Sequence, residues 1–287
     1  GGVCGQNAEY GTIENCPVLS GSVESGGGLN DICAGGIIGY NSGIIVGPIT
    51  NYADVNVSAD ADIYIYVGGI IGYSNSNENI SQIRNYGNMS SYNPFYDGYT
   101  RQHSYCGGLI GSSASSCKIS DSFNSGSVKS DYVSGGIFAY ADSVIINNCY
   151  NSGNIISESS DNFLYAVGLV GCSVRNIEVY KSFNSGDVCA KGLRRSAAAG
   201  LVSSISSCSI SNSYNVGSIS SFGGDSGYSA FLLPYASGLV CSSDNNCNLD
   251  IKNCYNIGLV SEYVYRDNST DSRDHRYELS SASASIF

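Results

Sequence analysis

The chain has 287 residues, with 13 basic and 24 acidic side chains and a net charge of −11, a balance that repels phosphate backbones and anionic bilayer surfaces and predicts no nucleic-acid partner. Hydrophobic residues make up 42% and charged residues only 13%, which excludes a disordered chain and supplies enough apolar side chains for a continuous core. Thirty-six Gly and 23 Tyr, with one Met and no Trp, favour strands and turns over helices, so we expect an all-β protein.

A repeat runs along the chain. Its first box is a short apolar step opened by glycine, as in "GGVCG", "GGIIG" and "GGLIG". Eight such boxes, 28 to 39 residues apart, start near Gly2, Gly36, Gly69, Gly108, Gly136, Gly168, Gly200 and Gly238. A period of this length predicts a repeat architecture in which each unit packs on its neighbours.

A second box, marked by a small residue, follows each first box after 17 to 20 residues. These residues are Gly21, Ala53, Gly87, Gly126, Gly153, Gly186, Gly217 and Gly258. Between the boxes apolar and polar residues alternate with period two, as in "CKISDSF" from Cys117 and "CSISNSY" from Cys208, which predicts a half-buried strand. The first box and the step after the second box predict two further strands.

Three short strands per unit, joined by turns, predict one coil of a single-stranded β-solenoid, also called a parallel β-helix. Stacked coils pair each strand with its copies above and below, about 4.8 Å apart. We expect about eight coils over residues 1–260, right-handed because parallel crossovers usually are. A polar C-terminal tail or cap is expected over residues 261–287.

Asparagine stands two places before the second-box residue in seven units. Because one Asn amide can bond the same amide in the adjacent coil, we expect a structural ladder, with a row of polar ligand contacts as the alternative. Its members are Asn51, Asn85, Asn124, Asn151, Asn184, Asn215 and Asn256. We expect the repeated glycines at corners, where positive φ or close approach between coils requires them.

The residue just before the ladder Asn is aromatic in five units: Phe123, Tyr150, Phe183, Tyr214 and Tyr255. We interpret these rings as a stacked row in the core. An outward aromatic row for sugar binding is the alternative.

The two boxes resemble the GLUG repeat family, named for its Gly-Leu-any-Gly signature. The matching segments are "GGLIG" at 107–111 and "GLVG" at 168–171, followed by a box similar to "NCYNSGNI". The resemblance covers residues 1 to about 260, but the last two units carry "AGLVS" and "SGLVC" where the family has a final Gly. The resemblance implies a bacterial, adhesin-like surface β-solenoid whose repeats serve as stalk or binding modules without catalysis of their own.

No metal or cofactor is predicted. A zinc site needs close Cys pairs, which the sequence lacks, and its two histidines, His103 and His275, are solitary. The hard oxygens of Asp244, Asn245 and Asn246 do not follow the D-x-D-x-D-G pattern of a calcium loop.

The twelve cysteines fit two interpretations. Four of them keep repeat phase at places where other units have Ser or Ile, which fits buried thiols: Cys117, Cys149, Cys208 and Cys254. In an oxidising compartment Cys241, Cys247 and Cys254 could form local bridges instead, and we expect a mixture of disulfides and thiols that leans to disulfides.

The Asn-x-Ser/Thr sequence occurs at Asn56, Asn79, Asn88 and Asn268. These residues are candidates for glycosylation if the source is a secretory eukaryote.

Two units carry long inserts after the second box, over residues 88–106 and 218–236, and these are the most aromatic stretches of the chain. Both inserts should leave the same corner of their coil. Because tyrosine combines apolar area with a hydroxyl, we expect partner-binding loops here. The candidate contacts are Tyr92, Phe95, Tyr96, Tyr99, Tyr105, Phe222, Tyr228, Phe231 and Tyr235. The alternative is that each insert covers apolar surface of its own coil.

We expect a non-catalytic, extracellular or cell-surface protein, a structural stalk or adhesin-like module that binds a glycan or protein of a host or neighbouring cell. The alternative is a filament subunit whose copies stack end to end through open strand edges. A carbohydrate-active β-helix enzyme is a third hypothesis, for which Asp60 and Asp62 are the local carboxylate pair. The chain starts within its first repeat and has no apolar run of about 18 residues, so we expect a portion of a longer secreted polypeptide without direct membrane insertion.

Overall fold

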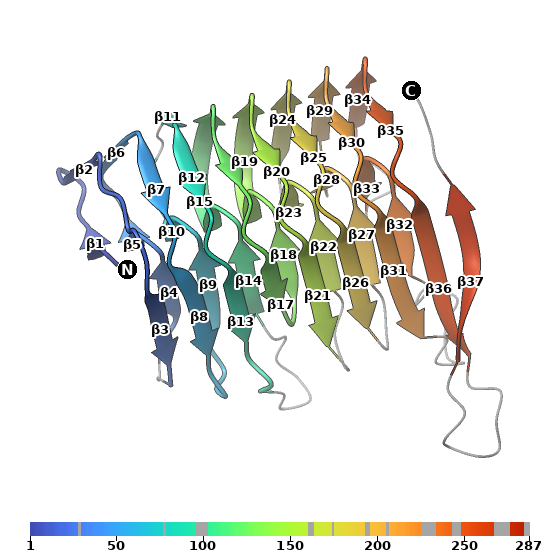
Figure 1. Cartoon of the computed structure of the whole chain (residues 1–287), viewed down its shortest axis with the longest axis horizontal. Coiled ribbons are helices and arrows are strands. Elements are labelled where there is room, and N and C mark those ends of the chain that lie inside the picture. The colour runs from blue at the N-terminus through green and yellow to red at the C-terminus, as the bar shows by residue number, and fades with distance from the viewer. Residues whose placement is uncertain are drawn as a thin grey trace.

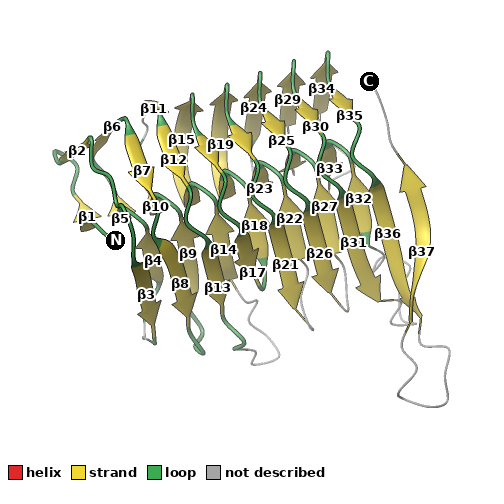
Figure 2. Ribbon diagram, viewed as in Figure 1, coloured by secondary structure: helices red, strands yellow, loops and turns green. Residues whose placement is uncertain are grey.

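The computed structural model shows an all-β rod in which strands of successive coils lie side by side along the long axis, from the N-terminal end to the C-terminal end (Figure 1). It describes residues 1–27, 30–76, 79–95, 103–159, 164–173, 175–192, 196–204, 207–224, 234–242, 248–266 and 276–283. Strands joined by turns make up this described part, which contains no helix (Figure 2). The predicted parallel β-solenoid is confirmed.

Sheet A is the largest sheet. Its main path runs through eight strands from successive coils, which are β1 (Cys4–Asn7), β5 (Ile38–Asn41), β10 (Ile71–Ser74), β15 (Ile110–Ser120), β19 (Phe138–Asn147), β23 (Val170–Ser173), β28 (Val202–Ser204) and β33 (Val240–Ser242). Four strands extend it sideways: β11 (Asn79–Ser81), β24 (Asn176–Tyr180), β29 (Ser207–Ser211) and β34 (Asn248–Lys252). Sheet B pairs β2 (Thr12–Glu14) with β6 (Ile44–Val46).

Sheet C carries the second box. Its strands are β7 (Ile49–Asn51), β12 (Ile83–Asn85), β16 (Phe123–Asn124), β20 (Tyr150–Asn151), β25 (Phe183–Asn184), β30 (Tyr214–Asn215) and β35 (Tyr255–Asn256).

Sheets D and E complete each coil. Sheet D contains β3 (Ser22–Gly26), β8 (Asp54–Ser58), β13 (Met89–Tyr92), β17 (Val128–Ser130), β21 (Ile155–Ser159), β26 (Val188–Gly192), β31 (Ile219–Gly224), β36 (Val260–Arg266) and β37 (Arg276–Ser283). Sheet E contains β4 (Ile32–Gly35), β9 (Tyr64–Gly68), β14 (His103–Gly107), β18 (Val133–Gly135), β22 (Leu164–Val167), β27 (Ser196–Ala199) and β32 (Tyr235–Ser237).

A complete coil has five strand segments, as in β23 to β27, so the expected three per unit was wrong. The sequence pattern missed the sheet E strand, which precedes the double glycine, and joined two segments that a sharp corner separates. That corner residue has positive φ and is not glycine: Asp121, Asn148, Lys181, Asn212 and Asn253 have φ near 50°. At the C-terminal end β37 turns back and pairs antiparallel with β36.

Inward side chains stack on their own copies in two cores. One contains residues of sheets A, B and C, including the alternating Ile119 and Ile210, and the other contains residues of sheets D and E. In sheet D a single buried column runs through Val55, Met89, Val128, Ile155, Val188, Ile219 and Val260. Burial of each such side chain contributes about 1.5–3 kcal/mol.

The Asn ladder is present in all seven predicted positions. Each Asn Nδ2 donates to the Oδ1 of the next coil's Asn at 2.7–2.8 Å, from Asn51 through to Asn256. The same Nδ2 donates to the backbone oxygen two residues on, for example from Asn151 to Gly153 at 2.8 Å. These side chains are at most 1% exposed, so the ladder satisfies amides that would otherwise be buried without partners.

The repeated glycines are required by close approach. A Cβ at Gly108 would lie 2.5 Å from Cγ of Asn124, and the first-box glycines from Gly36 to Gly238 stand in the same relation to the ladder Asn of their own coil. A Cβ at the second-box Gly126 would lie 1.7 Å from the backbone oxygen of Gly87. The two boxes of a unit are therefore in direct contact.

The aromatic row next to the ladder is stacked, but its predicted place in the core was wrong. Neighbouring rings from Phe123 to Tyr255 lie 4.8–5.0 Å apart with interplanar angles of at most 8°. The rings are half-buried on the outer surface, and Tyr255 is 38% exposed. Successive residues of a strand face opposite sides, and the ladder Asn holds the inward place.

No disulfide joins any two of the described cysteines, so the expected bridges gain no support, and Cys247 lies outside the described residues. Cys149 and Cys254 are buried and donate to backbone oxygens two residues earlier, at 3.3 and 3.1 Å. In other coils the hydroxyls of Ser182 and Ser213 make the same contact. The thiol thus replaces a serine in a buried turn.

Replacing a central ladder residue by Asn151→Ala should lower the free energy of unfolding by about 3 kcal/mol, because buried groups of the preceding coil, the next coil and Gly153 each lose a partner. Thermal and urea unfolding followed by circular dichroism would measure the loss. The control is Ser152→Ala, an exposed neighbour, which should change stability by less than about 0.5 kcal/mol. Equal effects of the two substitutions would contradict a structural ladder.

Candidate functional site

The aromatic residues predicted as insert contacts belong mostly to strands where the structure describes them. Tyr92 ends β13 and is 55% exposed, Tyr105 lies in β14, and Tyr235 begins β32 and is 39% exposed. Phe222 lies in β31 and stacks on Tyr263 at 4.4 Å. Phe95 is partly buried after β13, whereas Tyr96, Tyr99, Tyr228 and Phe231 lie outside the described residues.

The structure brings together a set of tyrosines on the outer surface where sheets E and A meet, and of the predicted contacts this set includes Tyr105. In sheet A, Tyr40, Tyr73, Ser112 and Tyr140 are in register across four coils. In sheet E, Tyr66 and Tyr105 are in register. We call the surface formed by Tyr40, Tyr64, Tyr66, Tyr73, Tyr105 and Tyr140 the tyrosine groove.

The groove is concave because the double-glycine turn folds the two sheets towards each other. A Cβ at Gly111 in β15 would lie 2.6 Å from the backbone oxygen of Val67 in β9. Rings from the two sheets then meet edge to face: Tyr66 and Tyr73 at 5.1 Å, and Tyr105 and Tyr140 at 5.5 Å. Such edge contacts are a favoured aromatic geometry.

Burial in the groove changes the acidity of its hydroxyls. Desolvation raises the pKa of Tyr66 and of Tyr105 well above the usual range, and nearby Asp31 adds to the shift at Tyr66 while Tyr132 adds to that at Tyr105. Desolvation first, and the charge of Asp31 second, raises the pKa of Cys33 to about 11. The hydroxyls of Tyr66 and Tyr105 and the Cys33 thiol are therefore neutral at physiological pH and act as hydrogen-bonding groups.

Two hollows lie along the groove. One, of about 570 Å³, is lined by Tyr40, Tyr66 and Tyr73 together with the carboxylates of Asp31 and Asp62. Asp31 is held in place because its Oδ1 accepts from the backbone N of Tyr64 at 2.9 Å. Asp62 is exposed, as is Asp60, in the turn before β9.

The second hollow, of about 530 Å³, shares Tyr66 and Tyr73 and adds Tyr64, Tyr105, Ser112, Ala114, Tyr140, Asp142 and Arg175. Arg175 Nε and Asp142 Oδ1 form an ion pair at 3.2 Å. Ring surfaces, hydroxyls and one neutralised charge pair form its lining. This composition suits reversible contact with a partner.

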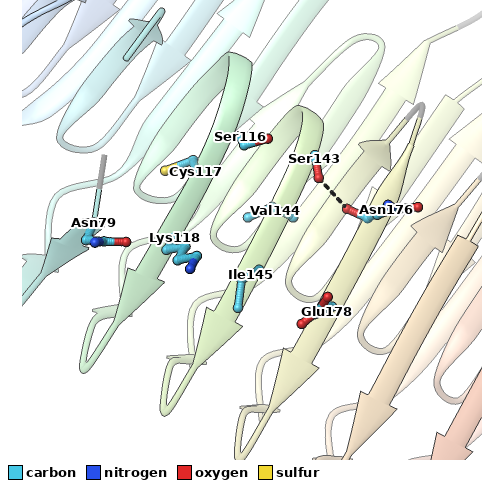
Figure 3. Close-up of a pocket in the computed structure, with 9 residues that line it drawn as sticks. All are labelled: Asn79, Ser116, Cys117, Lys118, Ser143, Val144, Ile145, Asn176 and Glu178. Atoms are coloured by element: carbon cyan, nitrogen blue, oxygen red, sulfur yellow. Dashed lines mark hydrogen bonds between the residues drawn. The ribbon is translucent and has the colours of Figure 1, made fainter. Parts of the chain in front are cut away.

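A further hollow of about 450 Å³ lies on the outer face of sheet A (Figure 3). Lys118, Ile145 and Glu178 stand in register on β15, β19 and β24, so the strands that carry the two opposite charges are about 9.6 Å apart. Ser143 Oγ donates to the backbone oxygen of Asn176 at 3.3 Å. Its lining contains no aromatic ring, so it lacks the converging apolar surfaces of the groove.

The sheet C aromatic row, Phe123 to Tyr255, is a weaker candidate for sugar binding. A sugar packs on the face of an aromatic ring, and in this row each internal ring face is already covered by the ring of the next coil. Tyr86 adds an edge contact to Phe123 at 5.3 Å. The row therefore presents ring edges to the solvent.

The sequons that the structure describes are exposed, at Asn56, Asn79 and Asn88. Asn88 Oδ1 accepts from the backbone N of Ser127 at 3.0 Å, and Asn56 Oδ1 accepts from Ser90 Oγ at 2.7 Å. Asn268 lies outside the described residues, as do His275 and the suggested calcium ligands Asp244, Asn245 and Asn246. Within the described part, no group of three or more metal-ligating side chains comes together.

A buried carboxylate anchors the start of the first insert. Asp131 is 3% exposed, and its Oδ2 accepts from the backbone N of Asn93 at 2.6 Å. Its Oδ1 has no hydrogen-bond partner within the described residues. Burial raises the pKa of Asp131 to about 6, against the opposing hydrogen bonds from Asn93 and Ser104.

Sequence reasoning missed the groove, although a signal exists. Tyrosine follows the first box directly in "GGIIGY" at 35–40, "GGIIGY" at 68–73 and "GGIFAY" at 135–140. Because the sheet E strand was not predicted, nothing placed Tyr66 or Tyr105 opposite these rings.

Comparison with protein-family models, curated proteins and solved structures finds no match to the chain. The resemblance to the GLUG repeat family therefore stays a prediction. No helix in the described residues has the length and hydropathy needed to cross a bilayer.

Asp131→Asn should stabilise the protein at pH 8. The folded pKa of about 6 lies above the ordinary 3.8, so Asp131 makes the free energy of unfolding fall as pH rises from about 4 to 6, by about 3 kcal/mol in total. The free energy of unfolding of the variant should exceed that of the unchanged chain by up to this amount at pH 8 and by little at pH 4. Urea unfolding at pH 8 and pH 4 measures this difference, with the exposed Asp62→Asn as the control. An equal effect of Asp131→Asn at the two pH values would contradict a raised pKa of Asp131.

Proposed function

We propose that the chain is a non-catalytic structural and adhesive repeat module, a stalk or adhesin-like rod that acts outside the cell or at its surface. The observation that carries the proposal is the tyrosine groove, a concave aromatic surface on the side of a rigid ladder-built rod. Its partner is a glycan or protein of a host or neighbouring cell. The extracellular placement is supported by the GLUG-like boxes.

The rod suits a presenting role because its frame is the same in every coil. The Asn ladder and the two stacked cores run through the successive coils, so the outer surface is held rigidly along the axis. Rigid presentation lowers the conformational entropy lost on binding. The groove rings also touch one another, which fixes their orientation before a partner arrives.

End-to-end assembly into a filament is a second candidate. Large apolar side chains are strongly exposed in the first coil, as Tyr10 at 89% and Leu19 at 74%, and in the last, as Ile257 at 60% and Leu259 at 56%. At the C-terminal end β37 pairs on β36, so a second copy would add through sheets A, C and E. Sedimentation and electron microscopy of Leu19→Glu test this, since the variant should shorten any fibres that the unchanged chain forms.

Fluorescently labelled full chain should bind saturably to epithelial or bacterial cells, with no release of reducing ends or unsaturated products from added polysaccharides. Tyr66→Ala should weaken binding about tenfold, because it removes a central groove ring. Tyr214→Ala, which removes a ring from the sheet C row, is the matched control and should leave binding unchanged. Turnover of an added polysaccharide would count against the proposal, as would an equal loss of cell binding in Tyr66→Ala and Tyr214→Ala.

A further inference from the structure

The aromatic column of sheet A has one ring missing. Tyr40 and Tyr73 stack at 5.3 Å with an interplanar angle of 14°, and Tyr140 holds the same register position two coils beyond Tyr73. In the coil between them the position is Ser112. We call this gap between Tyr73 and Tyr140 the Ser112 notch.

The notch is about one ring thick. Tyr73 and Tyr140 start from strands two steps apart, about 9.6 Å by strand spacing. One face of Tyr73 is covered by Tyr40, and the ring of Tyr66 meets Tyr73 in an edge-type contact at 5.1 Å. Ala114, exposed in the same strand, is also small, and both residues line the hollow of about 530 Å³ described above.

The floor and rim of the notch have different chemistry. Ser112 is only 2% exposed, so neighbouring side chains cover it and the hollow lies above it. Tyr105 and Tyr140 meet edge to face at 5.5 Å. At the rim, Asp142 and Arg175 form their ion pair, with the carboxylate side chain 22% and the guanidinium side chain 72% exposed. The paired charges leave no net charge to attract an ion.

We propose that the Ser112 notch is a subsite for one neutral pyranose residue of a glycan. The C–H face of the sugar packs on the rings of Tyr73 and Tyr140, which line the hollow above Ser112. Its hydroxyl groups donate to Asp142 and accept from Arg175. A peptide aromatic side chain fits the ring surface but supplies no hydroxyl pair for the rim.

This assignment separates the notch from the neighbouring hollow. There, Tyr40, Tyr66 and Tyr73 share their lining with Asp31 and Asp62, a combination that favours cationic groups. The notch, with its neutralised pair, discriminates by shape and hydroxyl geometry instead. The inference rests on the proposed adhesive function and names the ligand class for one part of the groove.

The test uses saturation-transfer difference NMR on the full chain. The probes are the methyl glycosides of glucose, galactose and mannose, with glucuronic acid and glucosamine as charged counterparts. At least one neutral glycoside should bind, and more tightly than either charged sugar. Ser112→Tyr should abolish that binding, because it restores a ring that the same position accommodates in three other coils.

Tyr73→Ala should weaken the same binding about tenfold, and Arg175→Gln should weaken it without removing the ring platform. Tyr214→Ala in the sheet C row should have no effect. Circular dichroism of each variant shows that the fold is retained, and Arg175→Gln keeps the test valid if Ser112→Tyr does not fold.

The inference is overturned if Ser112→Tyr and Arg175→Gln bind the neutral sugars as the unchanged chain does, if only glucosamine or a basic peptide binds, or if no sugar binds. Cell binding that is lost in Tyr66→Ala but retained in Ser112→Tyr would overturn the notch alone and leave the adhesive function standing. If both Tyr66→Ala and Ser112→Tyr bind cells as the unchanged chain does, the adhesive function is overturned as well.

Discussion

The whole rod depends on the contact between the ladder asparagine and the first-box glycine. Asn124 lies where a side chain on Gly108 would stand, and the same is true of Asn51 with Gly36. The amide also bonds its copies above and below at 2.8 Å. One buried side chain therefore bonds neighbouring coils at the spacing of the paired strands and also fills the space between two walls of its own coil. A side chain larger than glycine at the box, or a residue other than asparagine at the ladder, would disturb both at once.

The regular coil spacing then determines how aromatic rings are arranged on each outer face of the rod. On sheet C, the strand spacing places each ring flat on the ring of the next coil, so the faces of the internal rings are covered by their neighbours. Where sheets E and A fold together, the rings of each wall also stack along the axis, but rings from the two walls meet at 61° and 67° and line hollows between them. The same residue type thus makes a single stacked row on one side of the rod and a two-walled groove on another.

The periodic parts of the sequence predicted the frame well, because a ladder or a buried column is a property of one position repeated. The seven asparagines and the alternation around Ile119 and Ile210 are of this kind. The predicted direction of the Phe123 row was wrong, since the polar Asn124 takes the inward place, where it bonds the asparagines of both adjacent coils and the backbone oxygen of Gly126. The groove escaped prediction for a related reason: Tyr66 and Tyr73 are brought together by a corner angle, which no single-strand pattern encodes. For the cysteines, repeat phase indicated a buried thiol at Cys149, and the contact it makes is that of a serine in other coils, whereas the expected lean to disulfides gains no support.

Several departures from periodicity lie in one stretch of the rod. The first long insert lies between β13 and β14, the missing ring is at Ser112 in β15, and the register of β15 against β19 shifts between Ser113 and Ser116. In a solenoid, a change of backbone path in one coil is limited by the coils on both sides, because each strand pairs with two neighbours. The bulge and the small side chains accommodate that change on the outer face, while Leu109, Ile110 and Asn124 keep the buried positions unchanged. Specific recognition can therefore be built at one level of the rod without loss of the ladder that holds the other coils.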